Sequence, residues 1–130
     1  MGNMIGPKTP KPSKAEEREA YRIVTERDPV CVWCEAPGIQ RDHRKNRSQG
    51  GLTTPSNLQG LCLACHQIKT EHPAIALTVG LSVPSYARPE LWPALRLKAG
   101  RVRFVLYDDE GGFEPITAAT ARLLTEGQVG

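Results

Sequence analysis

Apolar and polar positions along the chain predict short elements rather than long ones. Apolar residues between 20 and 24 form a narrow face within the otherwise charged stretch 14–26. Ser13 precedes this stretch as an N-cap, and Glu16 stands three residues later as its capping-box partner. Pro29 ends the pattern, because the residue before a proline resists helical geometry. We therefore predict a helix over 14–26.

The middle of the chain alternates in short runs. Residues 39–43 predict one strand, and residues 58–61 predict a second that returns to pair with it. The polar loop over 44–56 is too long for a tight hairpin, so we expect it to serve the function. From Cys65 onward the pattern turns helical, and Pro73 either kinks one helix or begins a second.

The last third of the chain predicts a strand, a turn and a return strand. Residues 83–93 contain three prolines and predict an irregular connector. Residues 101–107 alternate between the set Val102, Phe104, Leu106 and the set Arg101, Arg103, Val105, as a strand does. A turn rich in acidic residues and glycine follows, and residues 113–116 can pair back.

Residues 117–126 predict a short terminal helix with Leu123 and Leu124 on its buried side. Taken together, the patterns predict three parts. We expect a disordered tail over 1–13, one domain over 14–82, and a C-terminal extension over 83–130 that packs on or beside the domain.

Composition adds two constraints to this picture. The 130 residues are only 5% aromatic and include 12 Gly and 11 Pro, so they do not supply a large apolar core. A small domain of this kind needs a staple, and a structural metal is one of the few available. No window approaches the roughly 18–20 apolar residues of a membrane span. We therefore expect a soluble protein without membrane contacts.

Charge is distributed unevenly along the chain. Residues 1–69 hold 11 Lys and Arg against 7 Asp and Glu, a net charge of +4, whereas residues 70–130 hold 6 against 7, a net charge of −1. The basic half is also the half that contains all four cysteines. This distribution favours a polyanionic partner.

The four cysteines form two Cys-x-x-Cys pairs, Cys31/Cys34 and Cys62/Cys65, separated by 27 residues. No N-terminal stretch resembles a secretory signal, so we expect a reducing, cytoplasmic compartment, in which such pairs bind metal more often than they form disulfides. Two such pairs, the second followed directly by a histidine, fit a thioredoxin-like redox site badly. Four thiolates make a closed, structural zinc site, and we predict one here.

His66 follows Cys65 directly and could replace one cysteine as a zinc ligand. Since four cysteines already suffice, and one residue along a helix rotates a side chain by about 100°, we expect His66 to face Asp42 and His43 instead. Within a strand those two residues point to opposite faces. The pattern predicts that Asp42 and His66 hold a hard divalent cation while His43 stays free as a base, the parts that phosphodiester hydrolysis needs.

Two stretches of the chain resemble a known family. DHRKNRSQGG and SNLQGLCLACHQIKT, framed by the two cysteine pairs, resemble the HNH endonucleases and are close to their small bacteriophage-type members. The resemblance covers roughly residues 30–72. It implies an α+β fold with a treble-clef-like ββα-metal core: two antiparallel strands and a helix around one catalytic divalent ion. The zinc knuckles would staple this core, with the N-terminal helix and the C-terminal strand-turn-helix added to it.

The resemblance also implies roles for individual residues. Asp42 and His66 match the ligands of the catalytic ion, which could be Mg²⁺, Mn²⁺, Ni²⁺ or Zn²⁺. His43 matches the general base, and Asn57 matches the middle asparagine that fixes the loop and so orients the base. The structural zinc ligands of many members are matched by Cys31, Cys34, Cys62 and Cys65. Products would carry 5′-phosphate and 3′-hydroxyl ends.

Basic residues flank the proposed base. Beside a phosphate-cleaving site such charges favour contacts with the DNA backbone, which give affinity without sequence preference. The predicted DNA contacts are Arg41, Arg44, Lys45 and Arg47, with Lys69 as a weaker candidate. Outside the motif, His72 is interpreted as an exposed residue at a helix end, and Trp33 and Trp92 as packing residues.

Two functions from different classes follow from these patterns. The first is a metal-dependent DNA endonuclease of low sequence specificity. By analogy with the bacteriophage-type members, it would act in genome processing or with DNA-packaging (terminase) proteins, in the host cytoplasm if phage-encoded. The alternative is a zinc-knuckle module that binds nucleic acid or protein without cutting. The two functions differ in the role of Asp42, His43 and His66, which act in catalysis in the endonuclease and only in folding in the binding module.

Overall fold

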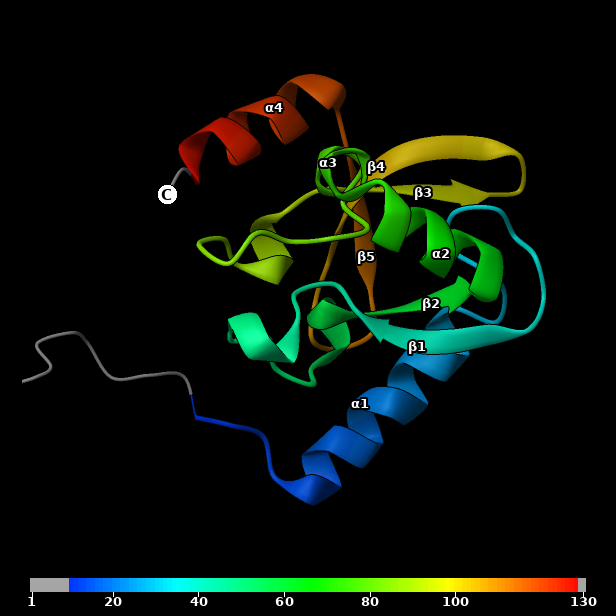
Figure 1. The fold of residues 1–130 in the computed structure, drawn as a ribbon, viewed down its shortest axis with the longest axis vertical. Helices are drawn as coiled ribbons and strands as arrows, with labels where there is room; N and C mark the ends of the chain where they lie inside the picture. Colours follow the sequence, from blue (N-terminus) through cyan, green and yellow to red (C-terminus); the bar gives the residue numbers. More distant parts are fainter. Residues whose placement is uncertain (1–9, 129–130) are drawn as a thin grey trace, which may run out of the picture.

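The computed structural model describes residues 10–128 and has helices and small sheets in one mixed α+β arrangement (Figure 1). Helix α1 spans Lys14–Arg27, one residue beyond the predicted helix. The Ser13 hydroxyl accepts a hydrogen bond from the Glu16 N–H, and the Glu16 carboxylate accepts one from the Ser13 N–H. The predicted capping box is confirmed. Residues 1–9 of the predicted disordered tail lie outside the described residues.

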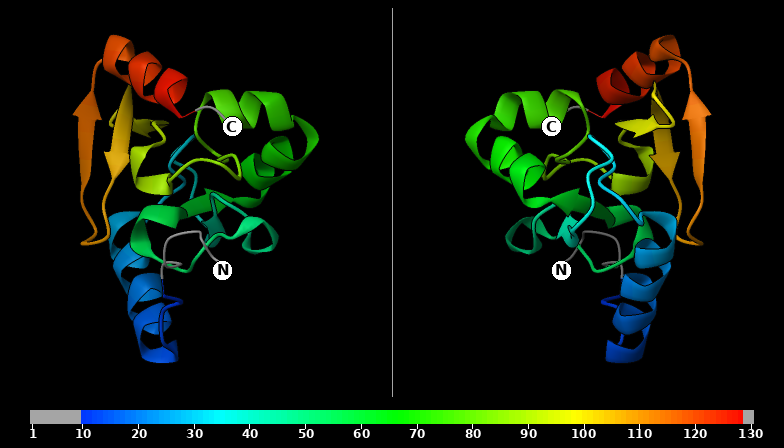
Figure 2. Two further views of the ribbon diagram at one scale, coloured as in Figure 1. Left: turned by 90° about the vertical axis from the view of Figure 1, so that its left-hand side faces the viewer. Right: turned by 90° about the vertical axis from the view of Figure 1, so that its right-hand side faces the viewer.

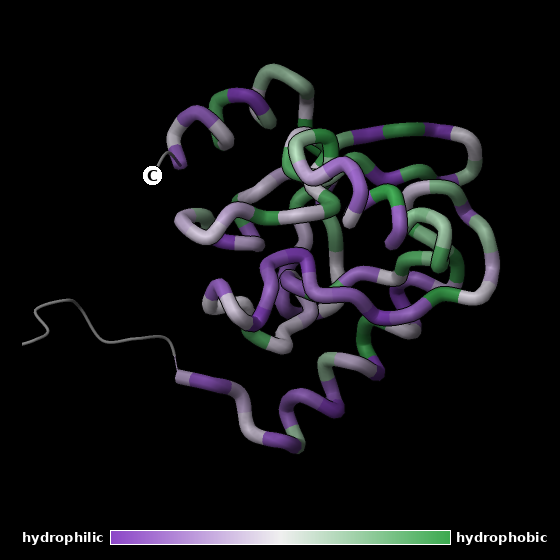
Figure 3. Tube along the Cα trace, in the orientation of Figure 1, coloured by the Kyte–Doolittle hydropathy of each residue, from purple (hydrophilic) through white to green (hydrophobic). Residues whose placement is uncertain are grey.

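The predicted strand pair is confirmed. Strand β1 spans Ile39–His43, strand β2 spans Leu58–Cys62, and they pair antiparallel with Asp42 opposite Gln59. Every residue of β2 is buried, because α1 packs against the pair from one side and α2 from the other. Figure 3 shows the contrast with β1, whose residues are mostly hydrophilic. The hairpin is therefore the middle layer of this part of the molecule.

Two helices follow β2 directly. Helix α2 spans Leu63–Glu71 and begins two residues earlier than the sequence pattern indicated, capped by the Cys62 sulfur. Helix α3 spans Pro73–Thr78, so Pro73 begins a second helix rather than kinking the first. None of the helices in the described part of the chain is long and apolar enough to cross a membrane.

The C-terminal segment forms a second sheet. Strand β4 spans Arg101–Tyr107 and β5 spans Phe113–Ile116, both as predicted. Strand β3, Ala94–Lys98, was not predicted, and it pairs antiparallel with β4 to give the order β3-β4-β5. Figure 2 shows this sheet and the helices α2 and α3 on opposite sides of the molecule.

Helix α4 spans Ala118–Gly127 and is capped by Thr117 as expected. The prediction that Leu123 is buried is wrong, since it is 69% exposed, and Ala121 takes the buried position. The sheet is attached to the remainder of the chain by backbone hydrogen bonds along β3, where Leu95 N–H donates to the Val79 carbonyl and Leu97 N–H to the Val32 carbonyl.

A buried ion cluster ties α1, β2 and β3 together. The Asp28 carboxylate, at the end of α1, is fully buried and accepts hydrogen bonds from Arg27, Arg96 and the Gly60 N–H. A side chain at position 60 would meet the Cβ of Asp28 at 2.8 Å, so only glycine allows this approach. Burial raises the pKa of Asp28, but the Arg27 and Arg96 guanidiniums outweigh it and hold the pKa below its usual value.

We predict that Asp28→Asn destabilises the fold by about 3–5 kcal/mol, because it leaves two buried guanidiniums without their counter-charge. Because the pKa of Asp28 is depressed in the folded state, its contribution is present above the unfolded-state value of about 3.9 and is lost as pH falls through the folded-state value. Urea unfolding of both proteins between pH 3 and pH 7 measures this. The difference should be largest at neutral pH.

The matched control is Glu26→Gln, which removes one carboxylate from an exposed ion pair with Arg22 on the same helix. It should unfold at the same urea concentration as the unchanged protein. Equal midpoints for Asp28→Asn and Glu26→Gln at pH 7 would contradict the role given to the buried cluster.

Candidate functional site

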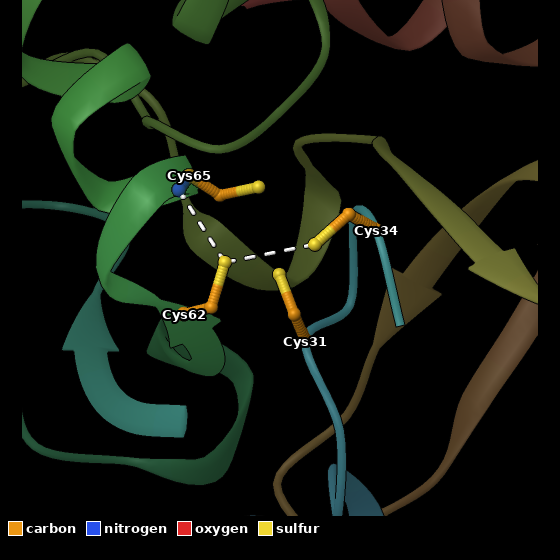
Figure 4. Close-up of side chains that lie close together, drawn as sticks. All are labelled: Cys31, Cys34, Cys62 and Cys65. Carbon is orange, nitrogen blue, oxygen red and sulfur yellow. Dashed lines mark hydrogen bonds between the residues drawn. The ribbon is translucent and has the colours of Figure 1, made fainter. Parts of the chain in front are cut away.

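The two cysteine pairs meet in one cluster. Cys31 and Cys34 lie in the turn after α1, whereas Cys62 ends β2 and Cys65 lies in the first turn of α2 (Figure 4). All four sulfur atoms lie within 4.8 Å of one another. Zn–S bonds of about 2.3 Å put tetrahedral sulfurs about 3.8 Å apart, so the cluster fits a single ion after small adjustments.

The four cysteines are not paired in disulfides. All four cysteines are free, and the Sγ atoms of Cys34 and Cys62 lie 3.6 Å apart. Burial raises the pKa of Cys62, but hydrogen bonds from the Cys65 N–H and from the neighbouring sulfurs outweigh it and lower the pKa to about 7. A thiolate is therefore accessible near neutral pH, and thiolate is the form that binds metal.

Asp42 and His66 lie side by side, as the sequence pattern predicted. The Asp42 Oδ1 and His66 Nε2 atoms are 3.4 Å apart, and the His66 side chain is 46% exposed. This spacing suits two ligand atoms that each lie about 2.1 Å from one ion. Because both residues come from different elements, β1 and α2, the pairing depends on the packing of that helix against the strand.

The second oxygen of Asp42 is held by polar neighbours. Lys69 Nζ lies 2.6 Å from Asp42 Oδ2 and also donates to the His43 carbonyl at 2.8 Å. Gln59, which faces Asp42 across the hairpin, donates its amide to the same Oδ2. The Lys69 side chain is only 10% exposed. The predicted DNA contact by Lys69 is therefore corrected: its ammonium orients the carboxylate inside the protein.

His43 lies on the other face of β1, together with Arg41, as strand alternation requires. Its Nε2 atom is 2.9 Å from the Thr53 hydroxyl and 3.4 Å from Arg47 Nε. Burial lowers the pKa of His43, and the positive charges of Arg47 and Lys69 lower it further against the opposing effect of Asp42. The imidazole is therefore neutral at neutral pH and can accept a proton.

Asn57 holds the loop that follows His43. Its side chain is fully buried, with Oδ1 accepting from the Lys45 N–H while Nδ2 donates to the Lys45 and Leu52 carbonyls. The Asn57 carbonyl accepts from the Arg44 N–H. One side chain thus closes both ends of the segment 45–52, and Thr53, the partner of His43, follows immediately.

Arg44 is the clearest error of the sequence-based assignment. We expected a DNA contact, yet the side chain is 1% exposed and its guanidinium donates to four backbone carbonyls. These acceptors are Ser56, Gly80, Pro89 and Trp92. Burial lowers the pKa of Arg44 to about 10. The residue joins the loop to the C-terminal segment and presents no donor to solvent.

The other predicted DNA contacts remain at the surface to different degrees. Arg41 and Arg47 are exposed and surround Tyr21 of α1: the Arg41 guanidinium lies 5.2 Å from the ring centroid, and Arg47 Nη2 lies 3.2 Å from the hydroxyl. Lys45 is half-buried and donates to the Ala87 carbonyl. Trp92 packs in the interior, and His72 is exposed at the end of α2, both as expected.

Sequence reasoning did not identify three residues that shape the site. Gln59 could have been found from the strand register, because it stands opposite Asp42. Tyr21 was interpreted only as part of the apolar face of α1, although its hydroxyl meets Arg47. Thr53 carries no signal in the sequence, since its contact with His43 depends on how the loop closes.

Comparison with known proteins identifies one family. Residues 31–72 match the model of the HNH endonuclease family. No curated protein and no solved structure matches the chain. The matched residues begin at the first cysteine and end just after α2, so they include the cysteine cluster, the hairpin and the helix that bears His66. These residues, about a third of the chain, are therefore similar to the HNH endonucleases.

Proposed function

We propose that the protein is a metal-dependent endonuclease that hydrolyses DNA phosphodiester bonds with low sequence specificity. The observation that carries the proposal is the arrangement around β1. Asp42 and His66 converge on one face of the strand, 3.4 Å apart, while His43 is oriented on the other face by Thr53 and Arg47. The hairpin carries Asp42 and His43, and α2 brings His66 to Asp42, so a cation ligand pair and a separate base are held by one hairpin and the helix packed on it.

The donor set of Asp42 and His66 suits a divalent ion. One carboxylate and one imidazole leave most coordination positions for water and phosphate oxygens, as catalytic sites require. Within residues 10–128, the four cysteines form the one cluster of three or more metal-binding side chains. The site at Asp42 and His66 would have only two protein ligands and would therefore be more open than the cysteine site. When bound, the ion would supply positive charge that neutralises the phosphate and the departing oxygen.

His43 would act as the general base. A neutral imidazole keeps one ring nitrogen without a proton, and the lowered pKa keeps the ring in that form. The loop held by Asn57 brings Thr53 and Arg47 to the ring and limits its motion. The imidazole would then take a proton from a water molecule, and the products would carry 5′-phosphate and 3′-hydroxyl ends.

The cysteine cluster supports a purely structural zinc ion. Four thiolates leave no open position, so this ion would take no part in cleavage. It would instead join the turn after α1 to the start of α2, and so fix the helix that carries His66. We infer that zinc holds the geometry of the catalytic pair.

Arg41 and Arg47 support low sequence specificity. Both are exposed, both lie on the His43 side of β1, and neither has a carboxylate within 4.0 Å among residues 10–128. Such charges bind the phosphate backbone, which carries no sequence information directly. A role in bacteriophage genome processing or packaging is supported by the similarity of the motif to the bacteriophage-type members.

We predict that His43→Ala lowers DNA cleavage about 10²-fold or more, because the variant has no general base. Supercoiled plasmid incubated with Mg²⁺, Mn²⁺ or Ni²⁺ measures nicking and linearisation on a gel. Folding and DNA affinity should be unchanged, because the His43 side chain is half-buried and contributes little to the packing of the core.

The control is His72→Ala, which removes an exposed histidine outside the site and should cleave at the original rate. If the unchanged protein cleaves no plasmid with any of these metals but still binds DNA, the chain is a zinc-knuckle binding module rather than an enzyme. If His43→Ala cleaves as fast as His72→Ala, the base is another residue.

We predict that Cys62→Ser abolishes cooperative folding, because the binding energy of a structural zinc ion is part of the folding free energy. Thermal unfolding followed by circular dichroism, together with zinc content by atomic absorption, measures both quantities. One equivalent of zinc per chain is expected before substitution. A cooperative melt that survives removal of the zinc would show that the cluster is dispensable for folding.

A further inference from the structure

The sheet β3-β4-β5 presents an unusual set of charges on one face. Arg96 and Lys98 on β3 stand directly opposite Arg103 and Arg101 on β4, so two like-charged cross-strand pairs follow one another. Like charges directly opposite destabilise a sheet. The net charge of residues 70–130 is −1 despite this basic face, because acidic residues in the turn after β4 offset its positive charges.

Only one of these four cations is neutralised within the described part of the chain. Arg96 is buried and donates to Asp28, whereas Lys98, Arg101 and Arg103 are exposed and have no carboxylate within 4.0 Å among residues 10–128. Strand β5 pairs only with residues 104–107 of β4, so Arg101 and Arg103 lie where β4 is itself an edge, and their charges also discourage pairing with another strand. No ion pair within the described residues uses the charges of Lys98, Arg101 and Arg103.

The same face is hollowed. The hollow has a volume of about 250 Å³, and the four cations line it together with Val105, Phe113 and Pro115. The Arg96 guanidinium lies 4.2 Å from the centroid of the Phe113 ring, and Lys98 Nζ lies 5.4 Å from it. The Arg96 guanidinium therefore covers one face of the Phe113 ring, and the hollow combines an apolar lining of Val105, Phe113 and Pro115 with a cationic rim. That combination suits a ligand with a flat apolar part and a negative charge.

We propose that this hollow binds one nucleotide of a single-stranded DNA segment, with its base against the apolar lining of Val105, Phe113 and Pro115 and its phosphate against Lys98, Arg101 and Arg103. Aromatic floors beside basic side chains are the usual means of holding single strands. The proposal rests on the proposed function in taking DNA as the polyanion. The sheet lies on the side of the molecule away from α2 and α3 (Figure 2), so this contact adds to binding and takes no part in cleavage.

The test measures binding without cleavage. In the His43→Ala background, and without added divalent metal, fluorescein-labelled oligothymidine of about twelve nucleotides, within the usual site size of such grooves, is titrated by fluorescence anisotropy at several salt concentrations. Arg101→Gln/Arg103→Gln should weaken binding about tenfold or more at low salt. The slope of log affinity against log salt should fall by about 1.4, which is about 0.7 for each phosphate of a single strand that the variant no longer neutralises.

The matched control is Arg88→Gln/Arg122→Gln, which removes the same charge from two exposed ion pairs elsewhere in the C-terminal segment. It should change affinity less than twofold and leave the slope unchanged. Phe113→Leu separates the base contact from the charge contact: it should weaken binding about fivefold or more without changing the slope. Thermal melts of each variant confirm that the sheet is intact.

Three results would overturn the proposal. The first is equal affinity and slope for the two double variants. The second is a weakening confined to duplex DNA of the same length. The third is that a poly-glutamate peptide binds as tightly as the oligonucleotide and that Arg101→Gln/Arg103→Gln abolishes this binding. That result would indicate an acidic protein as the ligand of the hollow. Failure of the proposed function would appear separately, as no plasmid cleavage by the original protein while this binding persists.

Discussion

The carboxylate of Asp28 is the contact on which the arrangement of the parts depends. A buried charge is tolerated only when it is paired and hydrogen-bonded, and the partners of Asp28 come from three separate places. Arg27 ends α1, Gly60 lies in β2, and Arg96 lies in β3. Arg27 donates to both carboxylate oxygens, Arg96 to Oδ1 and the Gly60 N–H to Oδ2, so a shift of any of the three elements would leave a buried polar group without its partner. The position of the β1-β2 hairpin is thereby tied to the C-terminal sheet.

Arg44 makes the second such tie, with a different chemistry. Its guanidinium is surrounded by carbonyl oxygens rather than by carboxylates, and these oxygens come from residues 56, 80, 89 and 92. Backbone carbonyls that would otherwise be buried without donors are satisfied by one side chain. Because Arg44 follows His43 directly, the start of the loop after His43 is held largely by residues outside the family match, at positions 80, 89 and 92. The segment after residue 82 thus supports the geometry of the site.

The sequence predicted those features that rest on local pattern. The Ser13 capping box, the strand at 39–43 and the spacing of the cysteines each depend on nearby residues, and the structure has them all. The burial of Arg44 could not be predicted, because nothing in the residue itself distinguishes a surface charge from one that meets four distant carbonyls. Strand β3 was missed for a related reason: it follows a proline-rich connector, and pairing with β4 is what makes it a strand.

Strand alternation gives the proposed cation ligand, Asp42, and the proposed base, His43, different neighbours. Asp42 and His43 are adjacent, yet Asp42 contacts His66 and Lys69 of α2, whereas His43 contacts Arg47 and Thr53 of the loop after β1. The carboxylate and the imidazole are therefore positioned by different segments of the chain. Lys69 links the two, because its ammonium bonds the Asp42 carboxylate, donates to the His43 carbonyl and, through its charge, lowers the pKa of the His43 imidazole.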